Sequence, residues 1–133
     1  MNDRLITSKN NAEPDAGPIF LVLERDHLVA EDMLGTLRHL GPCRAIHLSS
    51  PDELFAYLQD GIQISAAFLE MRLAQLIDSP ILQPLIDRGA RIVLTVGEDD
   101  ADRAEAQGWR MLARPFTDLM IRDILAESPK ATA

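Results

Sequence analysis

The sequence has one cysteine, 5% aromatic residues and no long hydrophobic run. Because Cys43 has no cysteine partner, no disulfide can form within the chain, and we interpret it as a small hydrophobic residue opening a strand. No apolar run approaches the roughly 20 residues that a membrane-spanning helix needs. The first residues are too polar for the apolar region of a signal peptide, so we expect a cytoplasmic protein.

Basic residues are also scarce, with 13 Lys and Arg against 21 Asp and Glu and a net charge of −8 at pH 7. This balance leaves no basic face to neutralise phosphates, so we expect neither nucleic acid nor a membrane surface as a partner. The three histidines fall in separate elements without ligand spacing, which predicts no metal site. No nucleophile is accompanied by a His–acid pair, and we expect no enzyme activity.

The chain does contain enough apolar residues for one folded domain, since 47% of its 133 residues are hydrophobic. Residues 1–17 are polar and end in a segment with proline and glycine, which predicts a flexible N-terminal tail. Residues 18–128 alternate short apolar runs with amphipathic stretches and are predicted to form the domain. Residues 129–133 are assigned to a C-terminal tail.

The alternation predicts a parallel sheet covered by helices on both faces. We expect strands near 19–23, 45–48, 64–69, 91–96 and 111–113, and helices near 26–40, 51–61, 78–89, 99–107 and 117–127. This pattern is typical of a flavodoxin-like α/β fold, a (βα)5 three-layer sandwich with strand order 2-1-3-4-5. A dinucleotide-binding fold is disfavoured because the turn after the first strand has no glycine to approach a pyrophosphate.

Polar or special residues follow four of the predicted strands. Glu24 follows the first, Glu70 the third, Gly97 the fourth and Arg114 the fifth. Because open parallel sheets build their sites at the carboxyl ends of the strands, these residues mark the predicted site.

Two segments resemble the receiver domain of bacterial two-component response regulators. The segment 21–31, LVLERDHLVAE, resembles the first strand and helix of that family, and Leu112-Ala113-Arg114-Pro115-Phe116 resembles its Lys-Pro-Phe motif. The resemblance covers residues 18–127. It implies a single-domain signalling protein in a two-component or phosphorelay pathway.

In this family, two acids after the first strand and an Asp after the third hold Mg²⁺, and that Asp accepts the phosphoryl group. A Ser or Thr after the fourth strand and a Lys after the fifth contact the phosphate, and an aromatic residue on the fifth strand acts as a switch. The resemblance places six residues of this chain at those positions: Glu24 and Arg25 at the acidic pair, Glu70 at the phosphoacceptor, Val96 at the hydroxyl residue, Arg114 at the lysine and Met111 at the switch aromatic.

These substitutions predict a pseudo-receiver that has lost its phosphorylation chemistry. Arg25 brings a permanent positive charge without a lone pair to the metal position. Glu70 is one methylene longer than Asp, and a misplacement of about 1 Å can cost about 10²-fold in rate. Val96 cannot donate a hydrogen bond to a phosphoryl oxygen. We therefore expect no cofactor and no Mg²⁺ binding.

The charges suggest a replacement for the metal, because two carboxylates, Glu24 and Glu70, face two arginines, Arg25 and Arg114. Guanidinium groups pair with carboxylates in a bidentate manner, so a permanent salt-bridge cluster is one interpretation. The other is that both arginines point into solvent, where ion pairs contribute only about 0–1 kcal/mol.

The leading hypothesis is a phosphorylation-independent module that binds a protein, such as a histidine kinase or another signalling protein, or forms a homodimer. One alternative is a working receiver that is phosphorylated at an unusual acid, Glu70 or Asp26. Another is a small-ligand sensor with an open pocket above the strand ends. Leu119 and Trp109 are predicted to form an exposed apolar interface on the last helix and strand.

Overall fold

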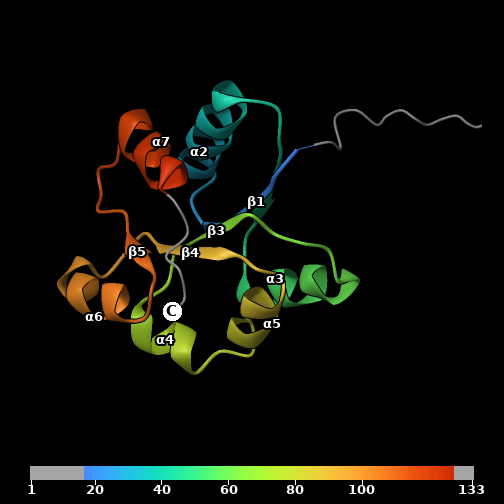
Figure 1. Cartoon of the computed structure of the whole chain (residues 1–133), viewed down its shortest axis with the longest axis vertical. Helices are drawn as coiled ribbons and strands as arrows, with labels where there is room; N and C mark the ends of the chain where they lie inside the picture. The colour runs from blue at the N-terminus through green and yellow to red at the C-terminus, as the bar shows by residue number, and fades with distance from the viewer. Residues whose placement is uncertain (1–16, 128–133) are drawn as a thin grey trace, which may run out of the picture.

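The computed structural model describes residues 17–127, so the predicted tails 1–17 and 129–133 lie almost entirely outside the described residues. The described chain alternates strands and helices (Figure 1). The strands are β1 (Ile19–Leu23), β2 (Arg44–Leu48), β3 (Ala66–Leu69), β4 (Arg91–Leu94) and β5 (Arg110–Met111). The helices are α2 (His27–Leu40), α3 (Pro51–Tyr57), α4 (Leu73–Ile77), α5 (Leu82–Asp87), α6 (Ala101–Ala106) and α7 (Asp118–Ala126), with 3₁₀ turns η2 (Leu58–Asp60) and η3 (Glu98–Asp100).

The strands form one parallel sheet in the order β2-β1-β3-β4-β5, which confirms the predicted flavodoxin-like topology. The central register pairs Leu23 with Leu69 and Leu69 with Leu94, so the chain leaves β1, β3 and β4 at one level. The strands are continuous apolar runs, as expected of parallel strands that are buried on both faces. This register brings Glu24, Glu70 and Thr95, each the first residue after its strand, to the same edge of the sheet.

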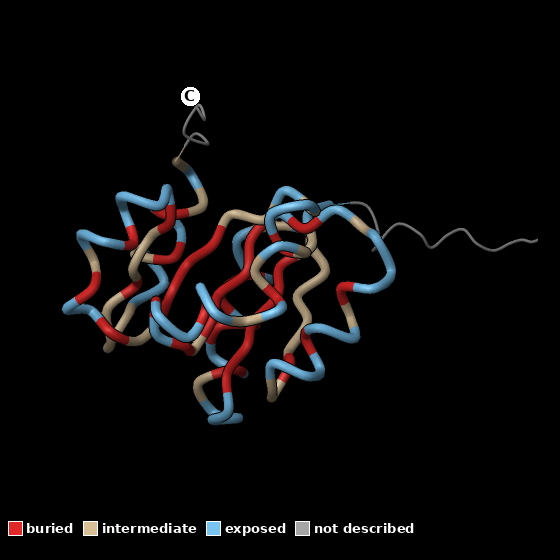
Figure 2. Tube along the Cα trace, turned by 90° about the horizontal axis from the view of Figure 1, so that it is seen from below, coloured by how far each residue is buried: buried red, intermediate tan, exposed pale blue. Residues whose placement is uncertain are grey.

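Two layers of helices cover the sheet. Helices α2 and α7 lie together on one face, and α3, α4, α5 and α6 lie on the other (Figure 1). The buried positions of the central strands run through the middle of the molecule between these layers (Figure 2). Alternate residues of each strand enter opposite cores, so Leu21 packs toward one helical layer and Val22 toward the other.

Polar side chains fix where the longer helices begin. The Asp26 carboxylate accepts hydrogen bonds from the backbone N–H groups of Leu28 and Val29 and caps α2, and the Thr117 hydroxyl accepts one from the N–H of Met120 and caps α7. These caps satisfy donors that have no partner within the helix. No helix between residues 17 and 127 is long and apolar enough to cross a membrane.

The region between β3 and β4 differs from the prediction of one helix over 78–89. The chain forms two short helices there, α4 and α5, separated by a turn at residues 78–81. Helix α4 was missed because five residues are too few to show a hydrophobic period. Its start is stabilised by the Gln75 side chain, which accepts a hydrogen bond from the backbone N–H of Arg72 at 3.1 Å.

Candidate functional site

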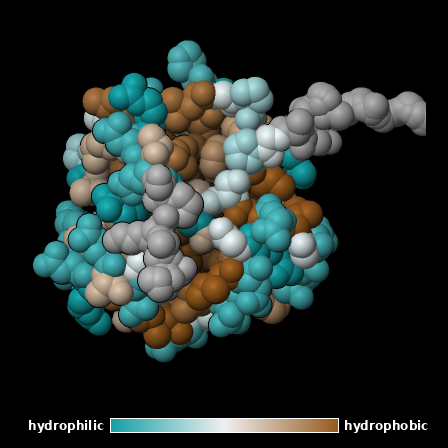
Figure 3. All heavy atoms as spheres, in the orientation of Figure 1, coloured by the Kyte–Doolittle hydropathy of each residue, from teal (hydrophilic) through white to brown (hydrophobic). Residues whose placement is uncertain are grey.

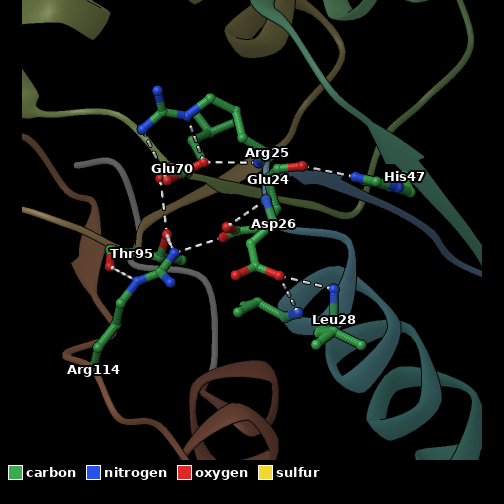
Figure 4. A network of polar contacts seen from close by, with 10 residues as sticks. Glu24, Arg25, Asp26, Leu28, His47, Glu70, Thr95 and Arg114 are labelled. Atoms are coloured by element: carbon green, nitrogen blue, oxygen red, sulfur yellow. Dashed lines mark hydrogen bonds and ion pairs between the residues drawn. The ribbon is translucent and has the colours of Figure 1, made fainter.

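The buried acid of the site is Glu24, whose exposed fraction is 1%. Its Oε1 atom accepts a hydrogen bond from Nη2 of Arg114 at 2.5 Å, and its Oε2 atom accepts one from the backbone N–H of Asp26 at 3.2 Å. Figure 4 shows Arg114 reaching across from the chain after β5 to the end of β1. A carboxylate this deeply buried needs a counter-charge, and Arg114 supplies it.

The second acid, Glu70, is bound by Arg25. Its Oε1 atom accepts hydrogen bonds from the backbone N–H of Arg25 at 2.8 Å and from Nε at 3.4 Å, and its Oε2 atom lies 3.3 Å from Nη2. Burial raises the pKa of the Glu70 carboxyl, but these hydrogen bonds and the charge of Arg25 together outweigh burial and lower that pKa below its ordinary value. The Arg25 side chain is 82% exposed, so this pair closes the site on its solvent side.

Both ion pairs that the charge balance suggested are therefore present, and neither arginine simply extends into solvent. Each pair joins two different strand ends: Arg25–Glu70 links β1 to β3, and Arg114–Glu24 links β5 to β1. One basic and one acidic side chain meet in each case, so the charges of these four residues balance in pairs.

The structure corrects the assignment of Val96 as the hydroxyl position. The residue that follows β4, as Glu70 follows β3, is Thr95, and its backbone N–H donates to the Leu69 carbonyl. Arg114 donates from Nη2 to the Thr95 hydroxyl at 3.2 Å and from Nε to the Thr95 carbonyl at 2.9 Å. The prediction extended β4 to Val96, whereas the strand ends at Leu94. The hydroxyl position was therefore assigned to Val96, one residue too late.

The β1–α2 turn is also held from the edge strand β2, by a contact that the sequence did not predict. Nε2 of His47 lies 2.7 Å from the Glu24 carbonyl oxygen, which accepts its hydrogen (Figure 4). The His47 ring packs edge-on against that of His27, with ring centroids 5.3 Å apart. Regular alternation placed His47 on β2, but only the pairing of β2 with β1 brings it to the site.

The donor set of this site does not fit Mg²⁺. Both oxygens of Glu70 accept hydrogen bonds from Arg25, and both oxygens of Glu24 already accept from Arg114 or backbone N–H. Two guanidinium groups also occupy the region where a divalent ion would need low positive potential. Within residues 17–127, no group of three or more His, Cys, Asp or Glu side chains could hold a metal ion.

A second network lies beside the first and was also not predicted. Nη2 of Arg72 donates to Oδ1 and Oδ2 of Asp99 at 2.9 and 3.0 Å and lies 3.4 Å from Oδ2 of Asp100. Arg103 donates to Oδ1 of Asp100 at 3.1 Å. The hydrogen bond from Arg72 lowers the pKa of the Asp99 carboxyl. The acidic residues Asp99 and Asp100 thus pair with an arginine from the loop after β3.

The predicted interface residues separate in the structure. Leu119 is 54% exposed on α7, which confirms its place on the surface, but Trp109 is only 8% exposed and belongs to the core beneath α6. The prediction for Trp109 is wrong, because its ring lies in the buried cluster that also contains Ala104 of α6. Met111, at the switch position, is partly buried against the same core.

A groove of about 980 Å³ runs between α2 and the start of α7. Its apolar lining includes Val29, Met33, Phe116 and Ile121, and its carboxylates are those of Glu31, Asp32 and Asp118. Figure 3 shows hydrophobic residues between α2 and α7 on the face that it draws. At one end the groove meets Arg114, so it adjoins the site.

Comparison with known proteins supports one class. No protein-family model matches the sequence, and no curated protein matches it. Among solved structures, the chain is similar to a response regulator receiver protein from Burkholderia phymatum, with 25% identity, a TM-score of 0.64, and coverage of 85% of this chain and 98% of that one. It is also similar to SdrG from Sphingomonas melonis, with 24% identity, a TM-score of 0.63, and coverage of 84% and 96%.

A third similar structure is the receiver domain of a sensor histidine kinase from Pseudomonas aeruginosa, with 18% identity, a TM-score of 0.61, and coverage of 83% and 95%. That structure has a magnesium ion coordinated in its active-site cleft. The chain therefore has the fold of the response regulator receiver domains to which it is similar. The resemblance that the sequence indicated is confirmed at this level.

Proposed function

We propose that this chain is an atypical receiver module that signals by binding a protein partner, without phosphorylation and without Mg²⁺. The observation that carries this proposal is the pair of arginine–carboxylate contacts that fills the site. Arg25 holds both oxygens of Glu70, and Arg114 holds Glu24. A phosphoryl donor and its metal would have to displace both arginines from their carboxylates before any transfer.

The presence of Thr95 reduces the number of features that weigh against phosphorylation. Because a hydroxyl group does follow β4, the loss of that group no longer counts against phosphorylation. The proposal therefore depends on three features: a Glu in place of Asp at position 70, the guanidinium of Arg25 in the metal region, and the use of Arg114 to neutralise Glu24. Any one of these would slow transfer, and together they act on the same phosphoryl position.

The two alternatives have less support. Asp26 caps α2 through two backbone hydrogen bonds, so its phosphorylation would uncap the helix. A small-ligand sensor would need an open pocket above the strand ends, where the arginine pairs lie. The large groove lies instead between α2 and α7. We keep a histidine kinase or another cytoplasmic signalling protein as the expected class of partner.

The surface that best suits such a partner is the groove between α2 and α7. Its apolar floor and its carboxylates Glu31, Asp32 and Asp118 are complementary to a helix that carries an apolar stripe flanked by basic residues. Leu28, 78% exposed on the first turn of α2, extends the apolar surface of this helix beside the site.

Phosphorylation is tested with acetyl phosphate and Mg²⁺, followed by mass spectrometry of the intact protein. The proposal expects no adduct, and a stoichiometric adduct at Glu70 would overturn it. Mg²⁺ binding is tested separately by titration calorimetry, where the proposal expects none. The receiver domain of the Pseudomonas aeruginosa kinase, whose structure holds a magnesium ion, serves as the positive control.

The groove is tested with an amphipathic Leu/Lys helical peptide as the probe, with binding followed by NMR. The double variant Glu31→Lys/Asp32→Lys should weaken binding at least about threefold more than Asp52→Lys/Asp60→Lys, which changes the net charge equally on exposed positions of α3 and η2. Equal weakening would show that only net charge matters and would remove the groove from the proposal.

A further inference from the structure

The loop that follows β4 is held at both ends by arginines from other parts of the chain. At its start, Arg114 binds the hydroxyl and carbonyl of Thr95. At its far end, Arg72 binds Asp99 and Asp100. We propose that Arg72 acts as a strap that fixes this loop, residues 95–100, in a single position over the carboxyl edge of the sheet.

The strap crosses between neighbouring strand ends. Arg72 lies two residues beyond Glu70, in the loop after β3, and its carboxylate partners lie 27 and 28 residues further along the chain. It joins the end of β3 to the end of β4. The ion pairs of the site link β1 to β3 and β5 to β1, but neither of them links β3 to β4. With Arg25–Glu70, Glu24–Arg114 and Arg114–Thr95, this contact completes a continuous chain of side-chain links across β1, β3, β4 and β5.

The glycine beneath the strap supports this role. Gly97 has a φ of +83°, in the left-handed region that favours glycine. A Cβ atom on Gly97 would lie 3.4 Å from Cζ and 3.5 Å from Cγ of Arg72, so the arginine lies directly across the glycine. Gly97 is buried although its loop lies at the surface, because the Arg72 side chain covers it.

Geometry distinguishes Arg72 from the other arginine of this cluster. Arg103 reaches Asp100 from the first turn of α6, three residues along the same segment, so its contact stays within the loop and its own helix. Arg72 is the partner that ties the loop to a different strand. Its contact with Asp99 is exposed on both sides, whereas the Asp100 side chain is 12% exposed. The Asp100 contact is therefore the less screened of the two.

The inference goes beyond the proposed function and does not depend on it. If the loop after β4 is fixed, α6 keeps one position relative to the site even when no ligand is bound. This makes the conformation of this face a property of the chain itself. Phosphorylation at Glu70 would contradict the proposed function but would leave the loop measurement unaffected.

The test is amide hydrogen exchange of the full chain, read by mass spectrometry for peptides that cover residues 95–101. Arg72→Ala should raise exchange there by about fivefold or more, while peptides from β1 and β3 stay within about twofold. Raising the salt from 0.05 M to 1 M should increase loop exchange in the unmodified protein and change it less in the variant.

Two further variants complete the experiment. Arg103→Ala removes one arginine from the same cluster but leaves the strap, so it should change loop exchange by less than about twofold. Asp99→Asn removes an exposed partner without threatening the fold and should raise loop exchange in the same direction as Arg72→Ala. The proposal is overturned if both Arg72→Ala and Asp99→Asn leave the loop within twofold, or if Arg103→Ala frees it as much as Arg72→Ala.

Discussion

Arg114 donates a hydrogen bond to Glu24 across 90 positions of sequence, and that contact places a guanidinium beside a carboxylate that is almost fully buried. The same guanidinium group contacts Thr95, so one side chain joins the ends of three strands. The Arg114 guanidinium thus balances the charge of the buried Glu24 carboxylate. This positive charge is part of the chain and cannot dissociate as a metal ion can. The arginine also stays charged at any relevant pH.

Removing this arginine should cost considerable stability. Arg114→Met keeps the apolar stem but leaves Glu24 buried without its partner, and we expect the free energy of unfolding to fall by about 3 kcal/mol. Urea unfolding measures it. Adding Glu24→Gln should recover part of the loss, because the buried charge is then gone. Arg110→Met, which breaks only ion pairs with Glu105 and Glu127, should change stability by less than about 1 kcal/mol.

Restoring acids should create a metal site. Arg25→Asp combined with Glu70→Asp removes one guanidinium and shortens the acid at the phosphoacceptor position, so we expect measurable Mg²⁺ binding by titration calorimetry. The single variant Glu70→Asp keeps Arg25 and should not bind. Tight Mg²⁺ binding by the unmodified protein would contradict the reasoning about both arginines.

The contribution of Glu70 to stability should depend on pH. Its pKa in the folded protein is lowered below the ordinary value of 4.5, because the hydrogen bonds and charge of Arg25 outweigh the effect of burial. Its contribution is therefore fully present above about pH 4.5 and is lost as the pH falls through the folded pKa. Glu70→Gln should be less stable than the unmodified protein near neutral pH, and the difference should disappear once the pH has fallen below the folded pKa of Glu70.

The difference at neutral pH should be about 1 kcal/mol or less, because Arg25 is largely exposed. In an Arg25→Met background, Glu70→Gln should have a smaller effect at every pH. Urea unfolding across the pH range measures both series. A difference that grew on acidification would mean that the folded pKa is raised.

Leu119 and Trp109 should respond in opposite ways to substitution. Leu119→Glu changes an exposed side chain on α7, so the free energy of unfolding should stay within about 0.5 kcal/mol. Trp109→Ala removes a buried ring and should cost about 3 kcal/mol or more. If this face mediates self-association, Leu119→Glu weakens it in analytical ultracentrifugation. Unchanged association would place any dimer contact elsewhere.

Gly97 and Gly108 offer a matched pair for the strap. Both have φ near +85°, at +83° and +87°, but only Gly97 has Arg72 lying across it, whereas a Cβ at Gly108 would meet nothing within 4 Å. Both alanine variants should lose about 1 kcal/mol from backbone strain. Gly97→Ala strains this loop itself and brings a methyl group into van der Waals contact with Arg72, so it should also raise hydrogen exchange in residues 95–101, which Gly108→Ala should leave unchanged.

Local patterns determined most of the fold. The five apolar runs and their alternation with amphipathic stretches were enough to predict a parallel sheet in the order 2-1-3-4-5. The sequence also brought the four charges of the site together, because residues at the carboxyl ends of adjacent parallel strands lie close together. It left open whether they pair or whether both arginines point into solvent, and the structure shows the pairs. Short elements were the exception, since the five residues of α4 carry too little periodicity to be recognised.

Tertiary structure decided the details that depend on register and on distant partners. Whether Thr95 or Val96 enters the site depends on where β4 stops, and a one-residue change in register reverses which side of the sheet a side chain faces. Trp109 is buried in a core cluster that also holds Ala104 of α6, a packing contact that strand five alone does not reveal. Arg72 meets Asp99 only because β3 and β4 are neighbours in the sheet. The sequence determined which charges were available, and the packing of the strands determined which of them meet.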